Sequence, residues 1–406
     1  MSQDYDVIVI GGGPAGSTAA GLLAKWGRRV LLLEKEKFPR YHIGESLVPG
    51  CIPVLAELGV IDAIEAAGAT RKYGLSLIWG ENTEPWSVDF DEICPHPYAY
   101  EVKRAEFDNL LLSQARTLGA IVVEEAVVRD LVFEGDRCVG VRYSQGRDHE
   151  TELRARFVID ASGQAKLLAR RLDVVSWHED LRHLAAWTYF QGGTRLEGRK
   201  AGNILVENNP PGWLWMIPFT DGTCSVGFVA PTVEYTATGQ PPEAVLKRQI
   251  ADSKLVSRLL DGATEVSQVR TAKDWSYATS RMSVPGGLMT GDAAAFIDPL
   301  FSTGVMLAMK GSSTAARAVT TLLDHPDLEA SILRGYERAY RDFLEVVVSF
   351  VRFFYDPSKK VEEYFERART LVDPAEAFAS RQDFITLISG LYGIAPIMEV
   401  EELQNA

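Results

Sequence analysis

The chain has 406 residues, 46% of them hydrophobic, and its 55 Asp and Glu outnumber its 42 Lys and Arg, for a formal net charge of -13. Nucleic-acid binding needs clustered positive charge, which a net negative chain does not favour. A membrane span needs about 18 apolar residues in a row, and the sequence has no such run. We therefore expect neither nucleic acid nor a membrane as a partner. The four widely spaced cysteines (Cys51, Cys94, Cys138, Cys224) and scattered histidines predict neither disulfides nor a metal site. A strand is predicted within five residues of the N-terminus, which leaves no room for a signal peptide, so we expect a cytoplasmic protein.

The N-terminal segment carries a dinucleotide-binding pattern. An apolar run over 5–10 predicts a buried parallel strand, and a helix rich in small residues is predicted over 17–26. Between them stands GGGPAG, which matches G-x-G-x-x-G in the required order of strand, turn and helix. Gly11 permits the turn, Gly13 lets the backbone approach a pyrophosphate, and Gly16 lets the helix pack against the strand.

Three acidic positions follow predicted strands, where a carboxylate suits the hydroxyls of a cofactor. The strand over 29–33 leads to Glu34, near the spacing expected for a ribose-binding acid. Asp160 ends the apolar run FVID before ASG, and Gly291 and Asp292 lie in the strand–turn–helix pattern GLMTGDA. Each of the two later patterns, taken alone, is compatible with a plain turn. Together with the first segment they resemble the FAD-binding fold of the para-hydroxybenzoate hydroxylase and geranylgeranyl reductase superfamily, over nearly the whole chain.

That resemblance implies an α/β fold with FAD as cofactor. We expect a Rossmann-like FAD-binding domain, an interleaved antiparallel β-sheet region on the substrate side, where alternating strands are predicted, and a C-terminal helical segment. The expected boundaries are 1–80, 99–175 and 268–330 for the FAD-binding domain, 81–98 and 181–267 for the substrate-side sheet, and 331–406 for the helical region.

The string WLWMIP lies in the predicted substrate-side sheet. Strand alternation places Trp213, Trp215 and Ile217 on one face, and Pro218 ends the strand. A sheet core that happens to use tryptophan would give the same pattern. The string resembles the W-x-W-x-I-P signature of flavin-dependent halogenases, in the region where that family carries it. The resemblance implies that these four residues form a bulky wall beside the flavin, which disfavours direct oxygen transfer to a substrate.

A second segment, KYG followed by WG, is similar to the K-x-G…W-G segment that carries the catalytic lysine of halogenases. The match identifies Lys72. An amine can hydrogen-bond hypohalous acid, or be halogenated to a haloamine, and a walled site would let it hold the electrophilic halogen near the substrate. Without this resemblance, a surface lysine beside Arg71 would be the ordinary interpretation.

A third segment, DPLFSTGV over 298–305, forms in this superfamily the loop and helix start beside the flavin ring. Backbone N–H groups of Thr303 and Gly304 would form an anion nest for chloride or bromide. Tryptophan-specific halogenases carry a glutamate in this segment, where this chain has Phe301. An indole needs a nearby carboxylate more than a phenol or pyrrole does, so Phe301 in the substrate pocket favours a phenol-like or pyrrole-like ring.

The segment FPRYHIGES resembles a stretch that runs along the flavin in the same family, so Gly44 and Ser46 are expected contacts and His42 is expected to be structural. Arg104, before a predicted helix, matches an arginine that contacts the flavin, and a surface arginine is the alternative. The residues that the resemblance implies for FAD are Gly11, Gly13, Pro14, Ala15, Gly16, Glu34, Lys35, Gly44, Ser46, Arg104, Val127, Asp160, Gly291, Asp292, Pro299, Gly304 and Val305.

The expected activity is that of a flavin-dependent halogenase of natural-product biosynthesis. FADH2 from a separate flavin reductase, oxygen and halide would give hypohalous acid, which reaches the ring through Lys72. Stretches around Phe354, Tyr364 and Phe384 resemble C-terminal helices of halogenases that act on carrier-protein-tethered aromatic acids. We therefore expect an acyl or peptidyl carrier protein as partner, although the acidic charge opposes an acidic carrier and a free phenol stays open. An aromatic hydroxylase, a geranylgeranyl-type reductase and a catalytically silent binding module are the alternatives.

Overall fold

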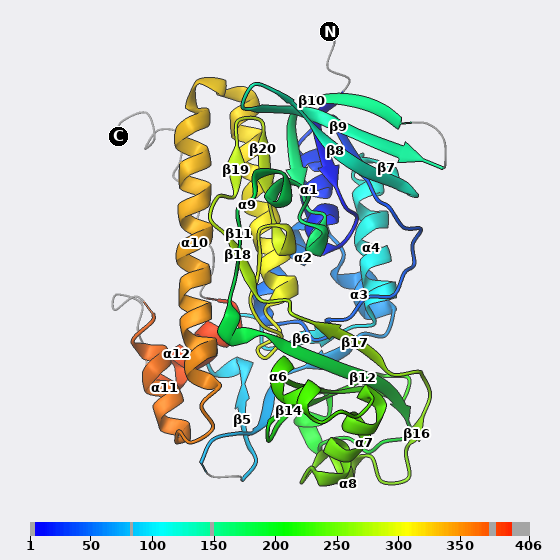
Figure 1. Ribbon diagram of the computed structural model, residues 1–406, viewed down its shortest axis with the longest axis vertical. Coiled ribbons are helices and arrows are strands. Elements are labelled where there is room, and N and C mark those ends of the chain that lie inside the picture. Colours follow the sequence, from blue (N-terminus) through cyan, green and yellow to red (C-terminus); the bar gives the residue numbers. More distant parts are fainter. Residues whose placement is uncertain (1–4, 82–83, 147–149, 373–378, 392–406) are drawn as a thin grey trace.

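The computed structural model describes residues 5–81, 84–146, 150–372 and 379–391. Its architecture is α/β, with a nucleotide-binding part in the upper half of Figure 1 and a substrate-side sheet in the lower half. The long helix α10 (Glu329–Phe354) runs beside both parts. The predicted fold class is confirmed. Residues 373–378 and 392–406 of the predicted helical region lie outside the described residues.

The nucleotide-binding sheet is built around parallel strands. Its order is β19–β20–β10–β1–β2–β7, and β10, β1 and β2 are paired in parallel with each other and with β20 and β7 at the sides. Helices cover such strands, so their side chains are buried on both faces. The strands are β1 (Tyr5–Ile10), β2 (Val30–Leu33), β7 (Ile121–Val123), β10 (Glu150–Asp160), β19 (Ser283–Val284) and β20 (Gly287–Met289), with β8 (Ala126–Glu134) and β9 (Arg137–Gln145) forming a hairpin that pairs with β10.

The carboxyl ends of these parallel strands bring the predicted cofactor motifs to one edge. β1 leads into Gly11, β2 into Glu34 and β20 into the turn at Gly291, while β10 ends at Asp160. The register pairs the last residues of β1, β2, β10 and β20 with one another across the sheet. Ligands of open α/β sheets bind outside this edge.

The substrate-side sheet is antiparallel except where β13 runs parallel to β4. Its strands, in spatial order, are β16 (Thr264–Glu265), β12 (His183–Gln191), β15 (Thr223–Pro231), β14 (Gly212–Pro218), β13 (Ile204–Asn209), β4 (Gly74–Ile78) and β5 (Trp86–Asp89), with β17 (Arg270–Lys273) also paired to β12. Strands β4 and β17 fall inside the ranges 1–80 and 268–330 that we assigned to the FAD-binding domain. Their hydrogen-bond partners belong to this sheet, so both boundaries needed correction at these strands.

This sheet separates two hydrophobic clusters. Trp213, Trp215 and Ile217 of β14 join the main core, whereas Leu214 and Met216 join a second cluster on the opposite face. That second cluster packs under α6 (Thr232–Ala237), α7 (Pro242–Asp252) and α8 (Val256–Leu259). The predicted alternation of the tryptophan strand is therefore confirmed, and its large side chains point toward the nucleotide-binding part.

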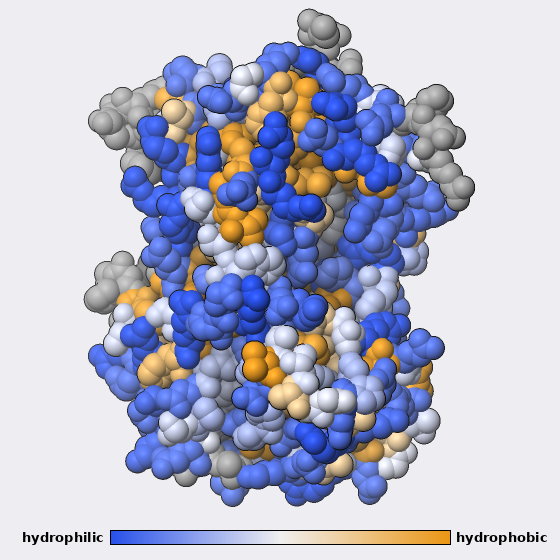
Figure 2. All heavy atoms as spheres, viewed as in Figure 1, coloured by the Kyte–Doolittle hydropathy of each residue, from blue (hydrophilic) through white to orange (hydrophobic). Residues whose placement is uncertain are grey.

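The remaining helices surround the first sheet, except for α11 and α12, which pack against the lower end of α10 and the edge strand β5. They are α1 (Pro14–Lys25), α2 (Ile52–Leu58), α3 (Ile61–Ala66), α4 (Arg104–Thr117), α5 (Leu167–Leu172), α9 (Gly304–Asp324), α11 (Val361–Arg369) and α12 (Ser380–Ile388). On the face in Figure 2, hydrophilic side chains predominate and hydrophobic ones gather in the upper half beside α10. Within the described ranges, no helix combines the length and the apolar character that crossing a membrane would require.

Candidate active site

The glycine-rich loop between β1 and α1 leaves no room for a side chain at Gly11 or Gly16. Gly11 has a φ of +100°, and a Cβ on Gly16 would lie 1.8 Å from the Gly11 carbonyl oxygen. Gly13 is the N-cap of α1, and Pro14 and Ala15 are its first residues. A helix start presents free N–H groups and the positive end of the helix dipole, which suit a pyrophosphate. The loop therefore fits the nucleotide half of FAD.

Glu34 lies against this loop. Its carboxylate accepts hydrogen bonds from the N–H groups of Gly12 at 2.6 Å and Glu36 at 2.8 Å, and the residue is 4% exposed. Lys35 is largely exposed and pairs with Glu36 at 3.6 Å, and Val127 is half-buried on β8. Glu34 is thus placed beside the loop that would hold the cofactor, while direct cofactor contacts of Glu34, Lys35 and Val127 stay predictions.

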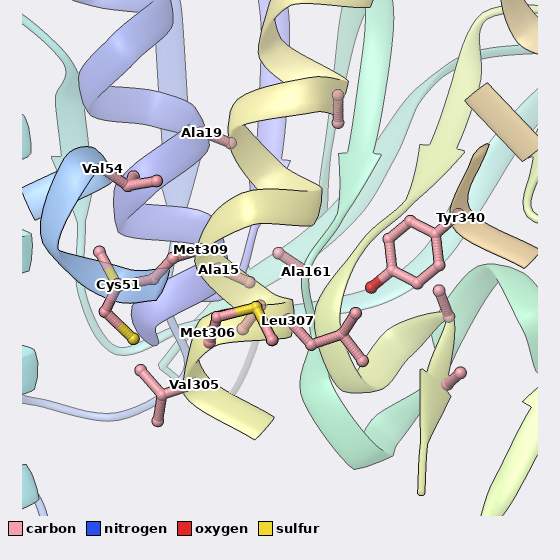
Figure 3. Close-up of a cluster of buried hydrophobic side chains, with 14 of the residues drawn as sticks. Ala15, Ala19, Cys51, Val54, Ala161, Val305, Met306, Leu307, Met309 and Tyr340 are labelled. Atoms are coloured by element: carbon pink, nitrogen blue, oxygen red, sulfur yellow. The ribbon is translucent and has the colours of Figure 1, made fainter. Parts of the chain in front are cut away.

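Two further segments meet the start of α1. Figure 3 shows α1 and α9 side by side, with Ala15 next to the first turns of α9. A Cβ on Gly291 would lie 3.0 Å from the Cβ of Ala15 and 3.3 Å from that of Ala308. The short helix η6 (Gly291–Ala293) is therefore held between the two long helices, and three sequence motifs form one surface.

The start of α9 was predicted to bind halide. Thr303 is its N-cap and Gly304 and Val305 are its first residues, after Pro299 and a residue, Ser302, with a φ of +58°. Among the hydrogen bonds of the described residues, none uses the N–H of Thr303 or Gly304. Such free N–H groups are what an anion requires. The geometry is compatible with a halide here, and the binding itself stays a prediction.

Arg104 is 6% exposed at the start of α4, so the surface alternative is wrong. Its Nε and Nη2 bind Asp108 at 2.8 and 3.0 Å, and its Nη1 donates to the carbonyls of Ile43 at 2.8 Å and Gly44 at 3.2 Å. Arg40 reaches the same Asp108 at 2.9 Å. These contacts fasten the segment around Gly44. Asp108 and Arg40 escaped the sequence reasoning, although the i,i+4 spacing of Arg104 and Asp108 was a usable signal.

The two aspartates at strand ends have different surroundings. Asp160 is fully buried, and its carboxylate accepts two backbone N–H groups of the following loop and helix, at 3.0 and 2.7 Å. It therefore anchors that loop, and its contact with FAD stays a prediction. Asp292 lies in η6, where burial raises its pKa to about 6 against the opposing charges of Arg104 and Lys166. A cationic pair around a strand-end carboxylate is compatible with a cofactor site.

Lys72 ends the short strand β3 (Thr70–Lys72) and is fully buried, so it is not a surface lysine. Its Nζ donates to Ser46 Oγ at 2.7 Å and to the Leu47 carbonyl at 3.0 Å, and lies 5.8 Å from the ring centroid of Phe90. Burial lowers the pKa of Lys72, and the nearby carboxylate of Glu101 opposes that shift. A buried lysine with a lowered pKa is suited to reacting as a free amine. Ser46, predicted to contact FAD, is the partner of this amine.

The tryptophan wall reaches the C-terminal helices. Trp213 Nε1 donates to Tyr355 Oη at 3.0 Å, and that hydroxyl donates to the Asp298 carboxylate, 3.0 Å from both oxygens. The His183 ring stacks on Tyr355 with centroids 4.9 Å apart. Burial raises the pKa of Asp298 to about 7. This network joins the substrate-side sheet, the predicted flavin loop and the end of α10, and no sequence pattern predicts that Tyr355 and His183 belong to it.

Phe301 lies inside an aromatic cluster and is 3% exposed. Its ring centroid is 5.3 Å from Phe350, 4.8 Å from Phe354 and 6.5 Å from Phe384. Helices α10 and α12 therefore cover the loop before α9. The other wall residues, Trp215, Ile217 and Pro218, are also buried, and Trp215 Nε1 donates to Ser225 Oγ at 3.2 Å. That these side chains line a flavin or substrate stays a prediction.

Comparison with known proteins identifies the family. The family model described as "FAD binding domain" matches residues 4–351. A tryptophan 2-halogenase from Chondromyces crocatus is 37% identical over 416 residues, an alignment that covers 100% of this chain and 79% of the relative. The chain belongs to the flavin-dependent halogenases.

Other relatives agree with this assignment of the chain to the halogenase family. A 1H-pyrrole-2-carbonyl-[peptidyl-carrier protein] chlorinase from Pseudomonas fluorescens is 30% identical, with 87% of this chain and 84% of the relative covered. The solved structure of a myxobacterial chondrochloren halogenase is 35% identical with a TM-score of 0.83, and covers 100% of this chain and 96% of its own. A flavin-dependent brominase reaches a TM-score of 0.84 at 26% identity, over 99% and 97%. The halogenase is therefore an FADH2-dependent oxidoreductase with FAD as cofactor and halide as substrate.

Proposed function

We propose that the halogenase attaches chlorine or bromine to a phenol-like or pyrrole-like ring, and that Lys72 relays the halogen to it. The observation that carries this proposal is a fully buried amine fixed beside the Gly44–Ser46 segment. The glycine-rich loop, η6 and the start of α9 would hold FAD. When bound and reduced, FAD supplies, with oxygen, the oxidising power that converts halide to hypohalous acid.

The contacts of Lys72 define what it can do to hypohalous acid. Two hydrogen bonds, to Ser46 Oγ and the Leu47 carbonyl, fix the position of Nζ. The remaining direction on nitrogen is then available for a hydrogen bond to hypohalous acid or for formation of a haloamine. Burial excludes water and mobile nucleophiles that would otherwise consume the electrophilic halogen. The amine would thus hold the halogen in one position relative to the ring.

The loop before α9 supports an electron-rich ring. Phe301 stands where a carboxylate would assist an indole, and the acid in the same loop, Asp298, is engaged by Tyr355 and has a raised pKa because it is buried. The name of the Chondromyces relative makes tryptophan the specific competing substrate. Tryptophan is therefore part of the test below.

We also propose that the substrate is tethered to a carrier protein and that a separate flavin reductase supplies FADH2. The pyrrole-specific relative is named for a peptidyl-carrier substrate, and α10 and α12 cover the loop at Phe301. The charges on α11 and on the segment before it are mixed, because Lys359 pairs with Asp356 at 3.5 Å and with Glu363 at 3.9 Å. Docking of an acidic carrier would therefore rely on other cations, such as Arg369.

The test is a reconstituted assay with a flavin reductase, NADH, FAD, oxygen and chloride or bromide. Substrates are phenolic and pyrrolic acids as carrier-protein thioesters and as small thioesters, with free phenols and free tryptophan beside them. The proposal predicts a halide-dependent mass gain on a phenol or pyrrole, larger for the carrier-bound form. Halogenation of tryptophan alone would overturn the ring assignment. Gain of one oxygen without halide would indicate the hydroxylase alternative.

A further inference from the structure

A fully buried carboxylate lies on the same face of a small sheet as Lys72. Strand β3 pairs in antiparallel register with β6 (Ala99–Glu101), and Thr70 lies opposite Glu101 while Lys72 lies opposite Ala99. Directly opposed residues share a face, and residues two apart share it too. Lys72 and Glu101 are therefore diagonal neighbours on the inner face, and both are 0% exposed.

The outer face of the same two strands provides a contrast. Arg71 and Tyr100 lie opposite each other and both bind the Glu65 carboxylate, at 2.7 and 2.8 Å. Glu65 is partly exposed, so its charge is solvated as well as paired. Neither oxygen of the inner Glu101 carboxylate meets full hydrogen-bond geometry with a donor among the described residues, although the Ser46 hydroxyl and the Ile204 N–H lie close enough to lower its pKa. A buried carboxylate with so little hydrogen bonding is stable only when it is protonated or lies beside a cation.

The cation available to Glu101 is Lys72. Ser46 lies between the two, because its backbone forms a β-bridge with Glu101 and its hydroxyl accepts from Lys72 Nζ. The other titratable groups around the pair are Cys51 beside Lys72, Glu45 beside Glu101, and Lys103, Glu106 and Asp221, which line a cavity that Glu101 also lines. Burial raises the pKa of Glu101 to about 7 against the attraction of Lys72, and it raises the pKa of the Cys51 thiol to about 11, so that thiol is neutral.

We propose that Glu101 is the proton partner of Lys72: the two buried side chains hold one proton between them, and the Glu101 carboxylate receives it when Lys72 acts as a free amine. This rests on the proposed role of Lys72. Ser46 lies between the two groups, so its hydroxyl carries the proton: the Nζ–H bond toward Ser46 breaks, Ser46 Oγ gains that proton, and Ser46 gives its own proton to Glu101, where an O–H bond forms. Once the neutral amine has rotated, its two N–H groups again have acceptors in Ser46 Oγ and the Leu47 carbonyl, so the lone pair of Nζ is left for the halogen.

The subsequent chemistry balances without a further reactant. The free amine attacks the halogen of hypohalous acid, so an N–halogen bond forms while the halogen–oxygen bond breaks. The departing hydroxide takes a proton from Nζ and leaves as water. When the halogen passes to the ring, the ring loses one proton and Nζ regains one. Glu101 thus acts through Lys72 and is a positioning residue.

Exchange of this proton with solvent would pass through a cavity that borders Glu101. A cavity of about 150 Å³ opens to the surface and is lined by Thr70 and Glu101, and by Lys103 and Asp221, which form an ion pair. Phe219 forms part of the same wall. The carboxylate oxygens of Glu101 are themselves buried, so exchange with water in this cavity requires a local opening of its wall.

The direct test measures the protonation of Lys72 in the full chain, without flavin or substrate. Protein labelled with [ε-¹³C]lysine is titrated by NMR, and the Lys72 signal is identified by its loss in Lys72→Arg. Removal of the carboxylate in Glu101→Gln is expected to lower the pKa of Lys72 by about one pH unit or more. The matched control, Glu65→Gln on the outer face of the same strands, is expected to leave it unchanged. A Lys72 pKa equal in wild type and Glu101→Gln would overturn the proposal.

A second measurement separates this inference from the role of Lys72. The acid limb of the pH profile for ring halogenation, with the thioester that the wild type halogenates best, is expected to move to lower pH in Glu101→Gln and to stay in place in Glu101→Asp, which keeps the charge. If Lys72→Ala halogenates as well as wild type, the proposed function fails. If Lys72→Ala is inactive and Glu101→Gln has the wild-type pH profile, only the inference about Glu101 fails. If Glu101→Gln does not fold, the same NMR titration of Lys72 is made in Glu101→Asp, which keeps the charge. The Lys72 signal is then expected to titrate as in wild type, and loss of that titration in Glu101→Asp would overturn the proposal.

Discussion

Replacement of Tyr355 by Phe tests the network that joins the two parts of the fold to α10. The hydroxyl accepts from Trp213 Nε1 and donates to Asp298, so the variant loses two hydrogen bonds and leaves both partners buried. A neutral hydrogen bond contributes about 0.5–1.5 kcal/mol and one to a charged group about 1.5–3 kcal/mol. Their sum predicts a loss of about 2–4.5 kcal/mol in the free energy of unfolding. Tyr336 lies in α10, which Tyr355 caps. Tyr336→Phe loses one neutral hydrogen bond, to the Met289 carbonyl at 2.6 Å, and is the matched control at about 1 kcal/mol.

The loss in Tyr355→Phe depends on pH in a defined direction. The Tyr355 hydroxyl favours the charged form of Asp298, whose pKa of about 7 is raised by burial, so its removal raises that pKa further. Below pH 7 Asp298 is protonated in both proteins, and the difference in unfolding free energy shrinks to the neutral bonds. Urea denaturation at pH 5.5 and 8.5 measures this, and the larger loss is expected at pH 8.5. A loss no larger than that of Tyr336→Phe, or one equal at both pH values, would refute the reasoning.

Three further predictions concern separate parts of the chain. Gly16→Ala places a Cβ 1.8 Å from the Gly11 carbonyl oxygen, so it should abolish FAD binding in a fluorescence titration. The Cβ of Gly13→Ala meets its nearest atom at 3.4 Å, so this variant should keep more of the affinity for FAD. Equal affinities of the two variants would contradict the loop geometry. Phe301→Ala leaves a cavity in the aromatic cluster and should cost about 3–5 kcal/mol in urea denaturation, while Phe301→Leu should cost distinctly less. The pKa of Asp298 in the folded state exceeds that of an ordinary carboxyl, so between about pH 4 and 7 the folded state binds more protons than the unfolded state. The free energy of unfolding should therefore fall as pH rises through that window. Asp298→Asn should lose this part of the pH dependence, and an unchanged pH dependence would count against burial of Asp298 as its cause.

The local patterns of the sequence were sufficient for the nucleotide end of the fold. The strand, glycine loop and helix are contiguous, so Gly11 and Gly16 carry the steric requirement within six positions. Strand alternation likewise placed Trp213 and Trp215 on one face without knowledge of their partners. The family resemblance then identified Lys72, whose burial no local pattern would predict.

The features that sequence reasoning missed depend on contacts between distant segments. Glu101 pairs with a strand about 30 positions away, and its carboxylate is notable only once Lys72 is seen on the same face. Tyr355 reaches Asp298 and Trp213 across two other segments, and nothing in the spacing of these residues predicts that contact. The membership of β4 and β17 in the substrate-side sheet was misassigned for the same reason, because sheet order does not follow chain order.

The role of Lys72 is the central claim, and one measurement tests it most directly. Wild type, Lys72→Ala and the exposed-site control Lys25→Ala are supplied with reductase, FADH2, oxygen and bromide, and both ring-halogenated thioester and hypohalous acid caught by a diffusible β-diketone trap are quantified. We expect Lys72→Ala to lose ring halogenation by about 100-fold or more while trapped hypohalous acid stays at the level of wild type and Lys25→Ala. Ring halogenation at the wild-type rate in Lys72→Ala, or equal loss of the trapped and ring-bound halogen, would contradict a relay through this amine.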